Sequence, residues 1–195
     1  MEEVDKMSEK NSWYEYRATY ETLEELAQQG LKREYVRHRD PRLDTAGEAG
    51  KTAVGTLGEL AFENWCSENL PGSRYIANEK EGPDEGDFIL PNNEVVDVKT
   101  QDCQKYSPDA SYRCEITEEQ MTHPMDVVVF AKLTREAQAP VLRLVGWLLK
   151  SEFDKIAEYR PRGTFLKGRR VTYPKFDVTI SELHPMVDLV SRGKM

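Results

Sequence analysis

The sequence predicts an α/β domain in which helices flank a mixed β-sheet. Strand-like segments follow one another between residues 73 and 100, separated by turn-forming residues. Residues 126–133 (DVVVFAKL) are almost continuously apolar, which is typical of a buried central strand. Helical patterns precede and follow these strands, and one domain with a mixed sheet accounts for the whole order.

Composition and charge limit the classes of function. The chain has 195 residues, enough for one domain with a sizeable core. Its net charge of -8 has the wrong sign for a protein that coats nucleic acid nonspecifically. Because no apolar run is as long as a membrane span and the acidic start does not resemble a signal peptide, we expect a cytoplasmic protein without a membrane partner.

The three cysteines, Cys66, Cys103 and Cys114, show neither CxxC pairing nor histidine partners at zinc-finger spacing. We expect reduced thiols that pack in the core. The histidines are far apart along the chain and nominate no site.

The first part of the chain predicts helices. Apolar residues recur at three- and four-residue intervals from Trp13 to Arg39, and Gly30 is expected to divide this stretch into two helices. We expect residues 1–45 to form a helical extension that packs on the main domain, residues 46–195.

A further helix is predicted over Lys51–Leu70, with an apolar stripe along one face. Gly55 and Gly58 lie on or beside that stripe. Because each glycine costs a helix about 1 kcal/mol relative to alanine, they indicate that something packs very close, such as a strand or a substrate backbone.

The rest of the chain alternates between strand and helix patterns. The expected strands are 73–78, 86–90, 94–100, 126–133, 141–149 and 171–176, and the expected helices are a short one at 117–121, then 151–159 and 183–190.

Two of these strands form a predicted hairpin around Pro91-Asn92-Asn93. Proline suits the second position of a type I turn, and asparagine tolerates the left-handed conformation that closes a three-residue loop. With such a loop Asp87 lies opposite Asp97, on the face that also carries Lys99. A two-residue loop would separate the two carboxylates. The apolar residues Phe88, Val96 and Val98 agree with the three-residue loop, because they then point together into the core.

Adjacent carboxylates repel each other unless they bind a cation or take up a proton. Mg²⁺ usually takes one or two carboxylates and completes its shell with water and substrate phosphate oxygens. Lys99 could orient the attacking water and offset the charge that develops on phosphorus. Asp87, Asp97 and Lys99 therefore predict metal-dependent hydrolysis of a phosphodiester.

These residues resemble the PD-(D/E)xK nuclease superfamily, which has the restriction-endonuclease-like fold. The resemblance lies in PDEGDFIL (residues 83–90), in DVK (residues 97–99) and in the preceding helix with GELAFENW (residues 58–65). It covers about the middle half of the chain, over the core order of helix, three strands, helix and strand. It implies a restriction-endonuclease-like mixed sheet flanked by helices, with 46–195 as the nuclease domain.

The resemblance also implies roles for individual residues. Asp87 and Asp97 would bind Mg²⁺, with Mn²⁺ as a substitute, and the main-chain carbonyl of Val98 would complete the shell. Glu59 would contribute from the helix, and Lys99 would position or activate the attacking water.

Two of these assignments have alternatives within the sequence. The motif aspartate could be Asp84, directly after the proline, but Asp87 begins the strand and satisfies the hairpin argument. Glu63, one helical turn from Glu59, could serve in its place.

Substrate contacts are expected from residues outside the carboxylate pair. Gln101 shares a face with Lys99. Basic residues gather at 32–42 and at 160–170, where Arg162, Arg169 and Arg170 are candidates for phosphate contacts, although a solvated charged surface explains either segment equally well.

The expected activity is metal-dependent cleavage of DNA. The alternatives are an inactive nucleic-acid-binding module of the same fold, a structure-selective nuclease such as a Holliday-junction resolvase, sequence-specific restriction-type cutting, and an RNA-directed nuclease. A homodimer is the simplest way for one-site protomers to cut both strands of a duplex.

Overall fold

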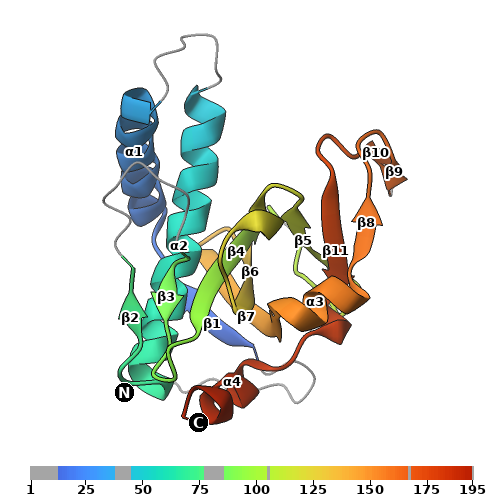
Figure 1. Cartoon of the computed structure of the whole chain (residues 1–195). Coiled ribbons are helices and arrows are strands. Elements are labelled where there is room, and N and C mark those ends of the chain that lie inside the picture. Colours follow the sequence, from blue (N-terminus) through green and yellow to red (C-terminus); the bar gives the residue numbers. More distant parts are fainter. Residues whose placement is uncertain (1–12, 38–44, 77–85, 105, 167, 195) are drawn as a thin grey trace.

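The structure is a computed structural model that describes residues 13–37, 45–76, 86–104, 106–166 and 168–194. These residues form a mixed α/β fold in which a curled mixed sheet is flanked by helices (Figure 1). The fold class predicted from the sequence is confirmed at this level.

The central sheet has the strand order β1-β7-β6-β4-β3-β2. Only β4 and β6 are parallel to each other, and all other neighbours are antiparallel. Continuous apolar runs explain why β6 and β7 are central and buried. The strands are β1 (Tyr14–Arg17), β2 (Arg74–Tyr75), β3 (Phe88–Ile89), β4 (Val95–Asp102), β6 (Val127–Arg135) and β7 (Pro140–Leu149).

The parallel pair requires a crossover between β4 and β6. The crossover contains a strand that was not predicted, β5 (Arg113–Thr117), followed by one turn of 3-10 helix, η1 (Gln120–Thr122). The short helix expected at residues 117–121 is therefore reduced to that turn. Thr117 still belongs to β5, whose pairing with β11 replaces helical hydrogen bonds.

The N-terminal segment differs from its helical prediction at two points. Residues Tyr14–Arg17 form β1 by pairing with the edge of β7, and their aromatic and charged side chains alternate between the two faces. Helix α1 (Tyr20–Arg37) then runs through Gly30 without the expected break and packs on α2. The cost of one helical glycine is about 1 kcal/mol, which tertiary packing can offset. The domain boundary at residue 45 stays a prediction.

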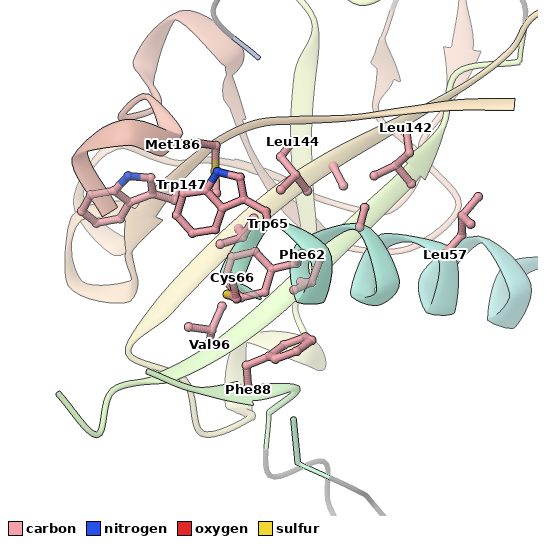
Figure 2. Packing of buried hydrophobic residues seen from close by; sticks show 14 of the residues in the cluster. Leu57, Phe62, Trp65, Cys66, Phe88, Val96, Leu142, Leu144, Trp147 and Met186 are labelled. Atoms are coloured by element: carbon pink, nitrogen blue, oxygen red, sulfur yellow. The ribbon is translucent and has the colours of Figure 1, made fainter. Parts of the chain in front are cut away.

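Helix α2 (Thr45–Asn69) covers one face of the central sheet (Figure 1). Figure 2 shows the core between them, where Phe62 and Trp65 of the helix face Phe88, Val96 and the residues of β7. The helix begins six residues before the predicted Lys51, and its apolar face is the predicted one.

The opposite face of the central sheet is covered by a second sheet with the order β5-β11-β8 and by α3. Phe130 of the central sheet packs there with Phe153 of α3. Two elements of this layer differ from their predicted bounds. The helix expected at 151–159 is α3, which ends at Ile156, and the strand expected at 171–176 is β11, which begins only at Lys175. The elements are α3 (Lys150–Ile156), β8 (Glu158–Arg160), β9 (Phe165–Leu166), β10 (Arg169–Arg170), β11 (Lys175–Thr179), η2 (Ile180–Glu182) and α4 (Met186–Gly193).

No helix in the described segments is long and apolar enough to cross a membrane. The three cysteines are free and buried, as predicted.

Candidate active site

The hairpin between β3 and β4 has the predicted register. Phe88 pairs with Val96 and Ile89 with Val95, and the Leu90 amide donates a hydrogen bond to the Glu94 carbonyl at 2.9 Å. The loop therefore holds three residues, and its last residue, Asn93, has a φ of 69°. The conformational tolerance of asparagine is what permits this closure.

Asp87 lies directly before β3, at the edge that faces β4. Its carboxylate accepts a hydrogen bond from the Val98 amide at 2.7 Å, and its own amide donates to the Val96 carbonyl at 2.8 Å. The N–H and C=O of one strand residue point to the same edge, so the Val98 carbonyl also points toward Asp87. The structure thus brings together the residues that the sequence analysis named at this position. Asp84 lies outside the described residues.

Asp97 and Lys99 form a close ion pair on β4. The Lys99 Nζ is 2.6 Å from Asp97 Oδ2, and the two side chains are 16% and 8% exposed. Both point to the same face, because they are two residues apart on one strand. Little water reaches the pair, so its attraction is screened less than that of a surface ion pair.

The surroundings of Asp87 raise its pKa from 3.8 to about 8. Burial is the largest cause, followed by the negative charges of Asp97 and Glu59. The Val98 amide and the charge of Lys99 offset only part of this effect. The neighbouring carboxylates therefore give the surroundings of Asp87 a negative potential, which favours a proton or a cation.

Glu59 reaches this region from α2. The Tyr75 hydroxyl donates a hydrogen bond to Glu59 Oε2 at 3.1 Å, and the Glu59 carboxylate acts electrostatically on Asp87. Glu63 is exposed on the same helix, and its charge raises the pKa of Cys66. Of the two glutamates, Glu59 is the one beside the aspartates.

A glycine allows α2 to approach β4 this closely. A Cβ atom on Gly58 would lie 1.8 Å from Thr100 Oγ1, so no other residue fits there without a shift. The predicted close approach is therefore confirmed for Gly58. No element of the described structure packs close to Gly55, where an added Cβ would meet no atom within 4 Å.

Within the described residues, no group of three or more His, Cys, Asp or Glu side chains is arranged to hold a metal ion as it stands. One oxygen of Asp97 is paired with Lys99 and one of Asp87 with the Val98 amide. The donor chemistry nevertheless suits Mg²⁺, which needs only one or two carboxylates besides water and phosphate oxygens.

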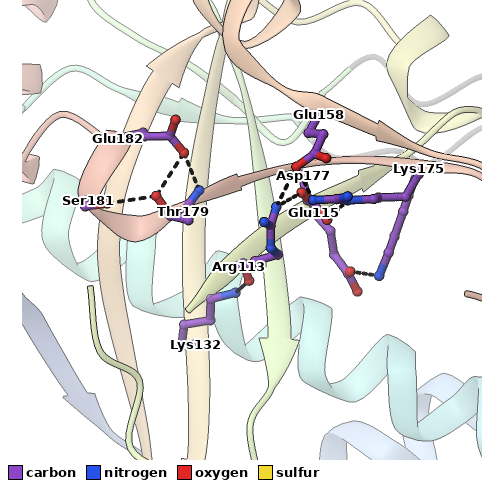
Figure 3. Close-up of polar contacts among 10 residues, drawn as sticks. Arg113, Glu115, Lys132, Glu158, Lys175, Asp177, Thr179, Ser181 and Glu182 are labelled. Atoms are coloured by element: carbon purple, nitrogen blue, oxygen red, sulfur yellow. Dashed lines mark hydrogen bonds and ion pairs between the residues drawn. The ribbon is translucent and has the colours of Figure 1, made fainter. Parts of the chain in front are cut away.

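Gln101 extends the Lys99 face of β4 and is held by a lysine that the sequence analysis did not single out. The Nζ of Lys132 donates to Gln101 Oε1 at 2.5 Å and to the Arg113 carbonyl at 2.6 Å, and it lies 5.2 Å from the centre of the Tyr112 ring. Figure 3 shows Lys132 reaching Arg113. Lys132 is buried. A lysine within an apolar strand pattern, FAKL, is the signal that could have identified it.

The candidate phosphate contacts lie on a separate arm. Arg162 is exposed in the turn after β8, and Arg169 and Arg170 form β10. Figure 1 shows β9 and β10 at the tip of the arm formed by β8 and β11, away from β4. The arginines are therefore not brought beside the carboxylates.

No family model matches this chain, and no curated protein matches it.

Proposed function

We propose that this protein is a Mg²⁺-dependent nuclease of the PD-(D/E)xK type that hydrolyses phosphodiester bonds of DNA. The carrying observation is the buried Asp87, on which the negative charges of Asp97 and Glu59 act, with Lys99 paired to Asp97. Such crowding of carboxylates is unfavourable unless a cation or a proton compensates it, and it is characteristic of sites that act on phosphate esters.

The order of elements supports a restriction-endonuclease-like core. Helix α2 is followed by the antiparallel strands β2, β3 and β4, and β6 then adds parallel to β4. The departure from the family pattern is the crossover, in which β5 stands where the family has a helix.

In the proposed reaction Asp87, Asp97 and the Val98 carbonyl would hold Mg²⁺, and Glu59 would contribute from α2. The bound metal would supply positive charge beside the scissile phosphate. Lys99 donates a hydrogen bond to the attacking water and stabilises the negative charge that develops on the phosphate oxygens. Asp97 positions the Lys99 ammonium, as their ion pair indicates.

The test is cleavage of duplex, single-stranded and branched DNA and of RNA, each with Mg²⁺, Mn²⁺ or a chelator. We expect metal-dependent cleavage of DNA, and a loss of at least about a hundredfold in Asp97→Ala and in Lys99→Ala. Asp102→Asn is the matched control, because Asp102 lies on the same strand in an ion pair with Arg135 and should be dispensable.

Undiminished cleavage by both site variants would disprove the assignment of the site. Absence of metal-dependent cleavage on every substrate would favour the inactive binding module instead. Asp97→Asn, which keeps the shape of the side chain, together with thermal unfolding of each variant, separates lost chemistry from lost folding. Titration with Mn²⁺ followed by calorimetry gives a second measurement, in which Asp97→Asn should weaken binding.

A further inference from the structure

The arm of β8, β9, β10 and β11 carries a concentration of positive charge that is unusual for this acidic chain. Residues 159–176 contain four arginines, two lysines and no acidic residue. Two of these cations are used in the fold: Arg160 pairs with Glu158 and Asp177, and Lys175 pairs with Glu115. Arg162 and Arg170 are exposed, and neither has an acidic partner among the described residues.

Aromatic rings are exposed on the same arm. Phe165 of β9 is 68% exposed, Tyr173 before β11 is 66% exposed and Tyr159 of β8 is 46% exposed. Aromatic rings exposed beside positive charges are a combination found where proteins bind single-stranded nucleic acid. The hairpin itself is well formed, since β9 and β10 pair antiparallel and Val171 exchanges backbone hydrogen bonds with Gly163 and Thr164.

The charges and the rings are combined at one place. Arg170 lies directly across the hairpin from Phe165, and its guanidinium carbon is 5.4 Å from the centre of the Phe165 ring. The arginine cation can contact phosphates, and the flat aromatic ring offers a surface on which an unpaired base can stack. Bases inside a duplex are already stacked on one another, so only an unpaired base can use the ring.

From this combination we propose that the β9–β10 hairpin binds single-stranded nucleic acid, with Phe165 stacking on an unpaired base and Arg162 and Arg170 contacting the adjoining phosphates. The proposal rests on the proposed nuclease function and makes it more specific, because it names substrates with unpaired nucleotides as the preferred class. A purely acidic polypeptide would satisfy the arginines but would leave the rings uncovered.

Ion pairs at the base of the arm hold the β9–β10 hairpin in place. Asp177 of β11 is buried and pairs with Arg113 of β5, as Figure 3 shows, and with Arg160 of β8. These contacts tie the arm to the layer that covers the central sheet. Substitution of Phe165 or Arg170 at the exposed tip should therefore leave the fold intact.

The experiment measures binding of the full chain to a labelled single strand and to a blunt duplex of the same sequence by fluorescence anisotropy in chelator, so that nothing is cleaved. We expect the single strand to bind more tightly. Phe165→Ala should weaken binding of the single strand at least about fivefold, with little change for the duplex, and Phe165→Tyr should restore it. Val187→Ala is the matched control, because Val187 is 65% exposed on α4, outside the arm.

The salt dependence of binding distinguishes the contribution of the arginine charges from that of the Phe165 ring. Arg162→Gln and Arg170→Gln should each flatten the slope of log affinity against log salt by about 0.7, the value for one phosphate contact on a single strand. Phe165→Ala should weaken binding without changing that slope. Poly-glutamate added as a competitor should displace the oligonucleotide poorly.

The proposal would be overturned if Phe165→Ala bound the single strand as tightly as the unchanged protein does. It would also be overturned if Phe165→Ala lost equal affinity for the single strand and the duplex. A third contrary result would be competition by poly-glutamate as effective as that by unlabelled oligonucleotide. Metal-dependent cleavage of single-stranded DNA that is unchanged in Phe165→Ala would reject the hairpin and retain the nuclease. Binding through Phe165 without metal-dependent cleavage would retain the hairpin and reject the nuclease. Absence of binding to any nucleic acid, together with absence of metal-dependent cleavage, would reject both.

Discussion

At the scale of single residues, the burial of Asp87 beside two other carboxylates dominates the behaviour of the site. A carboxyl group with a pKa of about 8 is protonated at neutral pH unless a cation is present. The metal-free protein would therefore hold a proton where Mg²⁺ would bind, and metal and proton would compete for the same oxygens.

This competition predicts how stability depends on pH in chelator. The pKa of Asp87 is raised in the folded state, so its contribution to stability is fully present below the unfolded value of 3.8 and is lost as pH rises through about 8. Asp87→Asn removes this titration. The free energy of unfolding of the unchanged protein, measured with urea, should fall between pH 4 and 8 relative to that of Asp87→Asn, by at most about 1.4 kcal/mol per pH unit. Parallel curves for the two proteins would contradict it.

At the scale of elements, the contact between α2 and β4 sets the distance from Glu59 to the aspartates. Gly58 lies against Thr100, and the Thr100 hydroxyl has no hydrogen-bond partner within the described structure. The helix has therefore no room to accommodate a side chain at this point, whereas Gly55, one turn earlier, has space around it.

The two glycines give a matched pair of substitutions. Gly58→Ala should destabilise the protein by about 1–3 kcal/mol through overpacking, and it should reduce cleavage by moving Glu59. Gly55→Ala should be neutral or stabilise the helix by up to about 1 kcal/mol. Urea unfolding and cleavage assays of both variants test this prediction. Equal effects of the two substitutions would show that the close contact with Thr100 has no energetic importance.

At the scale of the whole molecule, the central sheet separates two apolar cores. One lies under α2 and contains Cys66, and the other lies under the β5-β11-β8 sheet and contains Cys114. Burial raises the pKa of Cys66 to about 12 and that of Cys114 to about 11. Both thiols are thus protonated and shielded in the folded protein.

These cysteines report whether the two layers unfold together. We expect no alkylation of Cys66 or Cys114 in the native protein at pH 8, and modification of both over the same narrow range of urea concentration, because β6 and β7 contribute to both cores. Alkylation in increasing urea, followed by peptide mass spectrometry, measures each thiol separately. Modification of Cys114 at a lower urea concentration would mean that the second sheet unfolds independently.

Local sequence patterns were sufficient to predict the β3–β4 hairpin at the candidate site. A period of two residues places Asp97 and Lys99 together, and Pro91 and Asn93 limit the loop to three residues. Both features depend on backbone geometry over a dozen residues. The buried strands β6 and β7 could be predicted for the same reason, since their apolar runs are continuous.

Elements that depend on distant partners were not predictable in this way. Residues 14–17 form a strand because β7 offers them an open edge, and the β9–β10 hairpin has too few residues for a periodic signal. The same holds for single side chains: Lys132 is buried because Gln101 and the Arg113 carbonyl accept its hydrogen bonds. Each of these outcomes depends on a contact across the fold.

By itself, the sequence therefore determined the α/β class, the register of the β3–β4 hairpin and the placement of Asp97 and Lys99 on one face of β4, all of which follow from local backbone periodicity. The tertiary structure alone decided that Glu59 rather than Glu63 lies beside Asp87, and that the arginine-rich arm stands apart from the carboxylates. The physical reason is that the approach of α2 to β4, and of one sheet to the other, is set by packing between residues far apart in the chain.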